Sequence, residues 1–249
     1  MTDISLIASS RADGILQLTF NRPARRNALN GEMYLELARL VAAATAETEV
    51  RVILLQGGNG YFTAGNDLED FVPVPKELLA MRFFRAVAEC CKPVVAAVES
   101  CAIGIGTTIL GHCDFAYAGA STRFAAPFAK LGVCAEGASS LWLAQIAGDK
   151  RAAEILLLGE PFSAAAALEA GLITAVVEDG KATERAMEVA RRLAALSPEV
   201  VQANKKLLKH GRLAVIRETL DREEQEFLRL LAEAPAQTAI QAFLAPRKP

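Results

Sequence analysis

The amino-terminal part of the chain combines two short apolar runs with one amphipathic segment. Ile4–Ala8 and Ile15–Phe20 are separated by Asp13-Gly14, a dipeptide that favours a hairpin turn between two strands. Glu32–Ala46 then carries its apolar residues at the spacing of one helix face. The pattern therefore predicts a β-hairpin followed by an amphipathic helix.

The middle of the chain repeats this alternation. Val52–Gln56, Val94–Val98 and Asp114–Ala118 are short, mostly apolar runs typical of buried strands. Pro75–Cys91 lies between the first two and predicts a helix that ends before Pro93. Regular alternation of strands and helices indicates an α/β core.

From about Ala182 onward the pattern is almost entirely helical. Ser197-Pro198 marks a helix start, with proline at the first helical position. Leu213–Leu231 is amphipathic, so its apolar face has to cover either the core or a neighbouring subunit. We therefore divide the chain into a core, residues 1–195, and a helical C-terminal region, residues 196–249.

Composition narrows the class of protein. The 249 residues are 52% hydrophobic, which is enough for a large buried core, and the net charge of −2 gives no basic surface for nucleic acid. Apolar runs stay below the roughly 18 residues that cross a bilayer, and the N-terminus shows no secretory signal. Five cysteines without CxxC spacing favour a reducing compartment, so we expect a cytoplasmic protein. Two isolated histidines predict no metal site.

Two glycine-rich segments follow predicted strands. In residues 57–68 a strand leads into a loop that begins Gly57-Gly58, and in residues 97–108 a helix opens at Gly104-Ile105-Gly106. Each segment alone is compatible with an ordinary turn, or with close packing of a helix on a sheet. Together they can direct two backbone amides at one oxygen atom, which is the arrangement of an oxyanion hole.

These segments occur in an order that resembles the crotonase (enoyl-CoA hydratase/isomerase) superfamily. The similarity covers nearly the whole chain and is strongest between residues 18 and 178. It is carried by Asn21-Arg22-Pro23, Asn27-Ala28-Leu29, Phe62–Leu68, Gly104-Ile105-Gly106, Cys113-Asp114, Phe124–Pro127 and Ala165–Leu172.

The resemblance implies a spiral of ββα units, a helical C-terminal region that packs in trimers or dimers of trimers, and an acyl-CoA substrate with no separate cofactor. It implies that the amides of Asn66 and Ile105 hold the thioester oxygen, so the Asn66 side chain is expected to tolerate change. Further substrate-binding residues implied by it are Arg25, Arg26, Ala64, Gly65, Asp67, Leu68, Gly104, Phe128 and Trp142.

The chain lacks the two glutamates that catalyse hydration in other members of the family. Those members use two glutamates, at positions that correspond here to Thr108 and Phe128, so hydration by a carboxylate pair is not expected. Residues 132–140 instead resemble the segment of peroxisomal-type delta3,delta2-enoyl-CoA isomerases that carries their catalytic glutamate, and Glu136 occupies that position. A glutamate before a glycine is more often a surface or helix-start residue. Only the resemblance to the family therefore suggests a catalytic role for Glu136.

We therefore expect an enoyl-CoA isomerase in which Glu136 moves a double bond from C3–C4 to C2–C3. Ile105, Phe128 and Trp142 are expected to surround this carboxylate and raise its pKa. Two alternatives remain: a hydratase that uses Glu136 as its only acid/base, and a non-catalytic module that binds acyl-CoA.

Overall fold

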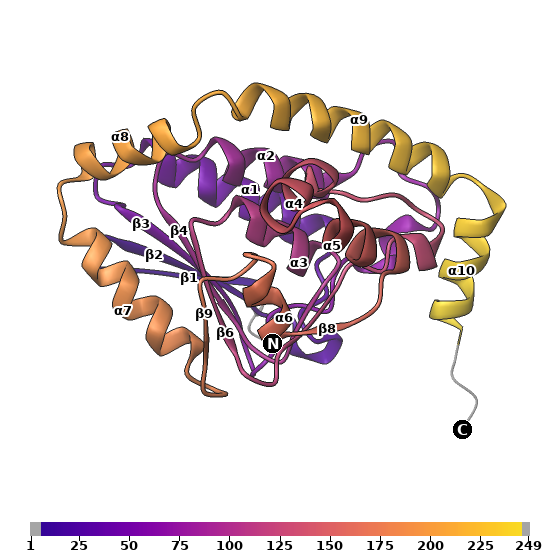
Figure 1. Ribbon diagram of the computed structural model, residues 1–249, viewed down its shortest axis with the longest axis horizontal. Coiled ribbons are helices and arrows are strands. Elements are labelled where there is room, and N and C mark those ends of the chain that lie inside the picture. The colour runs from indigo at the N-terminus through magenta and orange to yellow at the C-terminus, as the bar shows by residue number, and fades with distance from the viewer. Residues whose placement is uncertain (1–5, 246–249) are drawn as a thin grey trace, which may run out of the picture.

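The computed structural model describes residues 6–245, which form an α/β spiral around two sheets (Figure 1). The larger sheet has the strand order β1-β2-β3-β4-β6-β9; β1 is antiparallel to β2, and the remaining pairs are parallel. Its strands are β1 (Ile7–Ala12), β2 (Ile15–Phe20), β3 (Val52–Gly57), β4 (Val94–Val98), β6 (Phe115–Gly119) and β9 (Ala175–Val177).

The smaller sheet contains β5 (Cys101–Ile103), β7 (Arg123–Ala125) and β8 (Phe162–Ser163). The chain leaves β4 of the larger sheet, enters β5 of the smaller one and then forms a short helix, α3 (Ile105–Thr108). It repeats the step from the larger to the smaller sheet between β6 and β7. The predicted crotonase-like spiral of ββα units is therefore confirmed.

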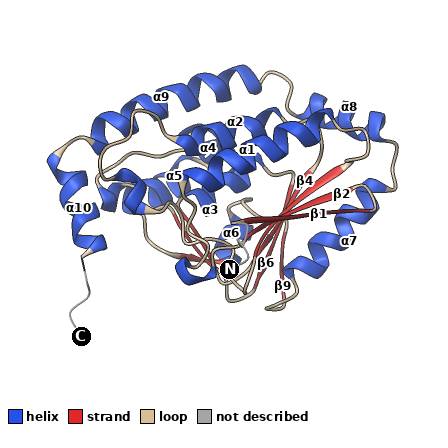
Figure 2. Ribbon diagram, turned by 180° about the vertical axis from the view of Figure 1, so that it is seen from behind, coloured by secondary structure: helices blue, strands red, loops and turns tan. Residues whose placement is uncertain are grey.

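Side chains that alternate along the central strands pack into two different hydrophobic cores, one on each face of the sheet. Val52 and Leu54 of β3 pack toward α7 (Ala182–Ala194), while Ile53 and Leu55 point to the opposite face. On that face lie α1 (Gly31–Ala46) and α2 (Leu79–Glu89), so the sheet is covered on both sides (Figure 2). Burial on both faces explains why these strands are continuously apolar.

The remaining helices complete the spiral and lead to the C-terminus. They are η1 (Pro23–Arg25), η2 (Leu68–Phe71), η3 (Ile109–His112), η4 (Ala129–Leu131), α4 (Ser139–Ala147), α5 (Asp149–Ala153), η5 (Glu154–Leu158), α6 (Ala164–Glu169), α8 (Pro198–Leu208), α9 (Leu213–Leu231) and α10 (Ala234–Leu244).

Two predicted boundaries differ from the structure. The helix expected over Pro75–Cys91 begins only at Leu79. The backbone just before it is bound to another helix, because the Leu78 N–H donates to Glu224 of α9 at 3.2 Å. The strand expected over Ile4–Ala8 is Ile7–Ala12, and the start of the expected range lies outside the described residues.

The C-terminal helices pack on the core. α9 runs across α2 and α4, and the buried ring of Phe227 lies 5.6 Å from that of Phe71 (Figure 1). α8 is more exposed, with 71% of Leu207 and 78% of Leu208 accessible. Among residues 6–245 no helix is both long and apolar enough to span a bilayer. The boundary after residue 195 stays a prediction.

Candidate active site

Two loops that follow neighbouring parallel strands are held side by side. The loop after β3 pairs with the start of β5, where the Thr63 N–H donates to Cys101 at 3.1 Å and the Ile103 N–H donates to Thr63 at 3.2 Å. Three residues beyond this parallel bridge come Asn66 on one segment and Ile105 on the other. The backbone itself therefore brings together the two positions expected to form an oxyanion hole.

Glycine precedes each of these positions, with a backbone conformation that other residues avoid. Gly65 has φ +101°, and a Cβ atom there would lie 3.0 Å from the Ile103 carbonyl oxygen. Gly104 has φ 53° and ψ −116° and opens α3. In the chain from residue 6 to 245, neither the Asn66 nor the Ile105 N–H has a hydrogen-bond acceptor. Both are therefore free to donate to a bound oxygen atom.

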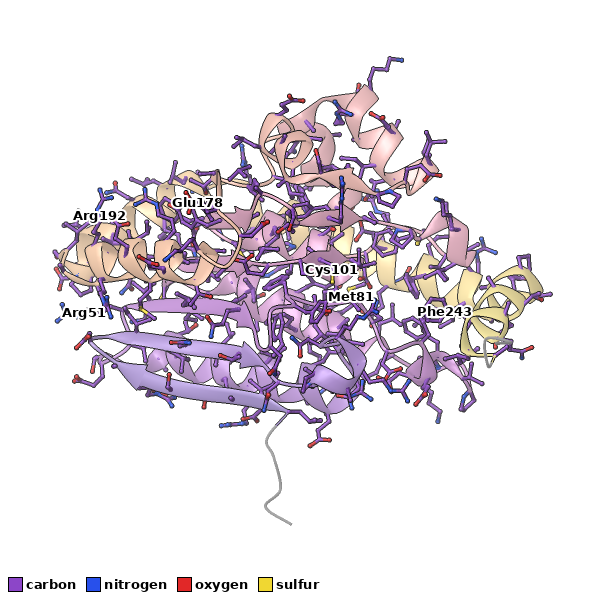
Figure 3. The ribbon with its side chains drawn as sticks, turned by 90° about the horizontal axis from the view of Figure 1, so that it is seen from below. Arg51, Met81, Cys101, Glu178, Arg192 and Phe243 are labelled. Carbon is purple, nitrogen blue, oxygen red and sulfur yellow. The ribbon has the colours of Figure 1, made fainter. Side chains whose placement is uncertain are left out.

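A cavity of about 520 Å³ lies beside these loops. The basic residues that line it are Arg25, Arg26 and Lys130. Arg25 is paired with Glu69 at 2.8 Å and Lys130 with Glu160 at 2.7 Å, whereas Arg26 has no ion-pair partner among residues 6–245. Phe243 of α10 lies at its rim and is 65% exposed, at the end of the molecule opposite to Arg192 of α7 (Figure 3). The expected residues that line this cavity are Arg25, Arg26, Ala64, Gly65, Asn66, Asp67, Leu68, Gly104 and Phe128.

A smaller cavity of about 220 Å³ contains the expected acid. Glu136 lines it together with the apolar side chains of Leu78 and Leu79. Asn66 and Phe71 line both cavities, so the two spaces lie next to each other at these residues. The carboxyl group of Glu136 and the basic residues therefore belong to adjoining cavities.

Glu136 is almost completely buried, with 1% of its surface exposed. Burial raises the pKa of its carboxyl group to about 8, opposed by the hydrogen bond from Asn66 and reinforced by the negative charge of Glu223. A carboxyl group with such a pKa exchanges a proton readily near neutral pH, as general acid/base catalysis requires.

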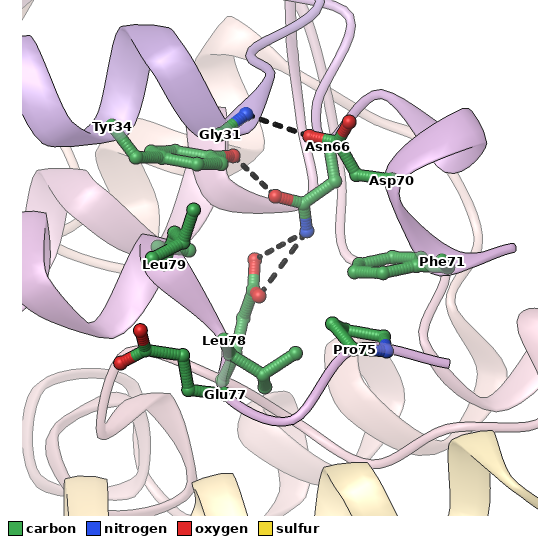
Figure 4. A pocket seen from close by; sticks show the side chains of 11 residues that line it. Gly31, Tyr34, Asn66, Asp70, Phe71, Pro75, Glu77, Leu78 and Leu79 are labelled. Atoms are coloured by element: carbon green, nitrogen blue, oxygen red, sulfur yellow. Dashed lines mark hydrogen bonds between the residues drawn. The ribbon is translucent and has the colours of Figure 1, made fainter. Parts of the chain in front are cut away.

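The side chain of Asn66 links the acid to α1. Its Nδ2 group donates to both carboxylate oxygens of Glu136, at 3.3 and 3.2 Å, and its Oδ1 atom accepts a hydrogen bond from the Tyr34 hydroxyl (Figure 4). Because an ionised carboxylate can only accept, the donor end of the amide faces Glu136, and the amide oxygen is left to accept from the hydroxyl. The expectation that only the backbone of Asn66 matters is therefore incomplete.

Two of the expected residues do not line either cavity. Ile105 is fully buried, so only its backbone can serve a ligand. Trp142 packs on the other side of the Glu136 loop, where its indole N–H donates to the Gly137 carbonyl at 2.9 Å. Phe128 lies beside Gly104, in the larger cavity. The expectation that these three side chains surround Glu136 was thus wrong; Phe71, Leu78 and Leu79 line its cavity instead.

His112 holds the backbone next to Glu136. Its Nε2 atom lies 2.7 Å from the Gly137 carbonyl oxygen, which can only accept, so Nε2 carries the proton. Burial lowers the pKa of His112 to about 4, and the ring therefore stays neutral. His112 and Trp142 together hold the backbone immediately after Glu136.

Two groups that contact this site could not be identified from the sequence. Tyr34 falls on the buried face of an amphipathic helix and was indistinguishable there from a core residue. Glu223 bonds the backbone after Glu136 from a helix more than 80 residues further along the chain. Only the fold brings such residues together.

Comparison with known proteins agrees with this geometry. Residues 10–249 match the family model for enoyl-CoA hydratase/isomerase. The chain is 32% identical to 2,3-dehydroadipyl-CoA hydratase of Escherichia coli over 99% of this chain and 98% of that protein. It is 31% identical to human enoyl-CoA delta isomerase 2 over 84% of this chain and 55% of that protein.

A solved structure gives the same result. The structure of OdaA from Pseudomonas aeruginosa superposes with a TM-score of 0.94 and 39% identity, and covers 97% of this chain and 99% of that one. The chain therefore belongs to the enoyl-CoA hydratase/isomerase family. Its relatives include both hydratases and isomerases, so family membership alone leaves the reaction open.

Proposed function

We propose that this chain is an enoyl-CoA isomerase that converts a 3-enoyl-CoA to the 2-enoyl-CoA, with Glu136 as its acid/base. The observation that carries the proposal is the position of Glu136. It is a buried carboxyl group in a small cavity, which lies next to the larger cavity at Asn66.

The proposed reaction needs one carboxylate and one oxyanion hole. Ionised Glu136 removes a proton from C2, and the electron pair moves onto the thioester oxygen, where the amides of Asn66 and Ile105 donate to it. The electron pair then returns from the oxygen of the dienolate, and C4 takes the proton from Glu136. The double bond of the product lies between C2 and C3. Each backbone donor of this kind contributes about 10²–10³ to the rate.

The side chains at two other positions favour isomerisation over hydration. Thr108 is buried, and its hydroxyl lies within 3.4 Å of the Gly104 carbonyl oxygen. Phe128 presents an apolar ring to the same region. Neither residue can hold and activate a water molecule as a carboxylate does, so hydration would have to rely on Glu136 alone.

The two activities can be compared on a single preparation. We expect the protein to convert a 3-enoyl-CoA to the conjugated 2-enoyl-CoA, followed by the ultraviolet absorbance of the product. Addition of water to a 2-enoyl-CoA should be much slower. Hydration as fast as isomerisation would favour the hydratase alternative, and binding without either conversion would favour an acyl-CoA-binding module.

The proposal extends to how the ligand is held and how the chain assembles. Arg26 would bind the phosphates of coenzyme A at the wall of the larger cavity, joined by Arg25 and Lys130 if they leave their exposed partners Glu69 and Glu160. The exposed leucines Leu207 and Leu208 of α8 are suited to contacts within a homotrimer or a dimer of trimers. Light scattering at micromolar concentration should give a trimeric or hexameric mass, whereas a monomeric mass would contradict this assembly. The cytoplasm remains the expected location.

A further inference from the structure

The loop that carries Glu136 has an unusual backbone. Gly137 has φ +72°, and Ala138 has φ +54°, a left-handed conformation that is unfavourable for an alanine. A Cβ atom at Gly137 would lie 2.4 Å from the ring of Phe84. Two successive residues of this kind persist only where the surroundings fix them.

Glu223 of α9 supplies much of that fixation. One of its carboxylate oxygens accepts from the Ala138 N–H at 2.6 Å; the other accepts from the N–H and the hydroxyl of Ser140, at 3.0 and 2.5 Å. These donors lie at the N-terminus of α4, where backbone N–H groups have no partner within the helix. One side chain thus bonds Ala138, which has the left-handed backbone, and Ser140, two residues further along.

The Glu223 carboxylate caps the N-terminus of α4, which stabilises that helix, but the cap also buries a charge. Glu223 is 7% exposed, and within residues 6–245 it has no lysine, arginine or histidine partner. Removing a carboxylate from water without a counter-ion is costly, and an apolar side chain often stabilises such a site better. Its three hydrogen bonds instead specify one conformation of the loop.

We propose that Glu223 is a positioning residue, which holds the loop of residues 136–140 so that the Glu136 carboxylate faces the smaller cavity. It makes the geometry of the active site depend on α9, which runs over α2 and α4 (Figure 1). The kinetic part of this inference rests on the proposed isomerase function; the structural part does not.

α9 has other attachments that remain when Glu223 is changed. Arg85 of α2 pairs with Asp221 and Glu224, both at 2.8 Å. Glu224 also accepts from the Leu78 N–H. The variant Glu223→Gln is therefore expected to keep α9 in place and to lose only the interactions of one carboxylate.

The test compares Glu223→Gln with Glu226→Gln, a matched control on the same helix whose side chain pairs with Arg229 at the surface. Without substrate, we expect the amides of Ala138 and Ser140 to exchange hydrogen for deuterium about tenfold faster in Glu223→Gln. The fluorescence of Trp142, the only tryptophan, should also change. Both readouts should stay as in the wild type in Glu226→Gln, and unchanged exchange in Glu223→Gln would overturn the inference.

The kinetic readout separates positioning from general destabilisation. With a 3-enoyl-CoA, Glu223→Gln should lower kcat about tenfold to a hundredfold and leave KM nearly unchanged, because a misplaced acid still allows binding. An unchanged kcat, or a higher KM alone, would contradict the proposal. If Glu223→Gln does not fold, Ser140→Ala removes one of the bonds, and it should shift kcat and exchange in the same direction.

The pH profile adds a signature that a merely structural role would not produce. The groups around Glu136 are the amide of Asn66, the phenol of Tyr34 beyond it, Glu223, Cys134 on the same loop, and the carboxylates of Asp70 and Glu77 that line the same cavity. Without the negative charge of Glu223, the pKa of Glu136 should fall. The acidic limb of the pH–rate profile should therefore move to lower pH. Failure of the wild type to isomerise would refute the proposed function, while the exchange measurement would still decide the role of Glu223.

Discussion

The two halves of the proposed active site are built by different means. The amides of Asn66 and Ile105 are positioned by main-chain pairing between Thr63 and the segment around Ala102, together with two glycines. Glu136 is positioned by side chains that come from distant parts of the chain. Main-chain geometry tolerates substitution except at glycine, whereas a site held by side chains depends on each of them.

This difference predicts which substitutions damage which half. Changes in the acid should abolish chemistry and spare binding. Changes at the glycines should displace the oxyanion donors. Changes in the side chains around the acid should lower the rate and shift the pKa of Glu136. Three variants test this difference, in decreasing order of the loss of rate that we expect.

Glu136→Gln should lower isomerisation by about 10³-fold or more, because the amide can neither accept nor return the proton. Acyl-CoA binding, measured by calorimetry, should remain close to that of the wild type. Glu77→Gln is the matched control, since Glu77 lines the same cavity but pairs with Arg82 at the surface. Near-normal turnover of folded Glu136→Gln protein would refute the assignment.

Gly104→Val should lower kcat by about 10²–10³, the effect of losing one oxyanion donor. A valine cannot adopt φ 53° and ψ −116° without strain, so the Ile105 amide would turn away from its position. Gly60→Ala is the comparison, because Gly60 also has positive φ and a Cβ atom there would meet nothing within 4 Å. Equal losses of activity in both variants would show that backbone strain, rather than the amide, is responsible.

Asn66→Ala should lower kcat by about tenfold to a hundredfold, the usual consequence of removing a hydrogen bond to a charged group. Its amide lowers the pKa of Glu136, so that pKa should rise in the variant, and the acidic limb of the rate profile should move to higher pH. This shift is opposite to the one expected for Glu223→Gln. A rate equal to the wild type would restore the view that only the Asn66 backbone matters.

The sequence predicted the main-chain half of the site better than the side-chain half. Glycines after strands reveal where a backbone needs freedom, so the loops of Gly65 and Gly104 were visible as a local pattern. The helix Leu213–Leu231 was also predicted with the observed bounds, because its apolar period is long and regular.

The contacts around Glu136 could not be predicted in the same way. Tyr34 and Glu223 are ordinary residues of amphipathic helices until the fold places them at the site. The position of Trp142 was predicted wrongly because closeness in sequence to Glu136 does not say which side of the loop a helix residue faces. Long-range side-chain contacts are set by packing between elements, which a single sequence does not display.

The most direct test of the account is to follow a 3-enoyl-CoA in deuterated water by nuclear magnetic resonance, with the wild type and Glu136→Gln. A single carboxylic acid that is 1% exposed should carry part of the C2 proton to C4 before it exchanges with solvent. We therefore predict 2-enoyl-CoA as the product, in which part of the hydrogen added at C4 is protium transferred from C2. Glu136→Gln should give no such product. A 3-hydroxyacyl-CoA as the main product, or equal conversion by Glu136→Gln, would contradict the account.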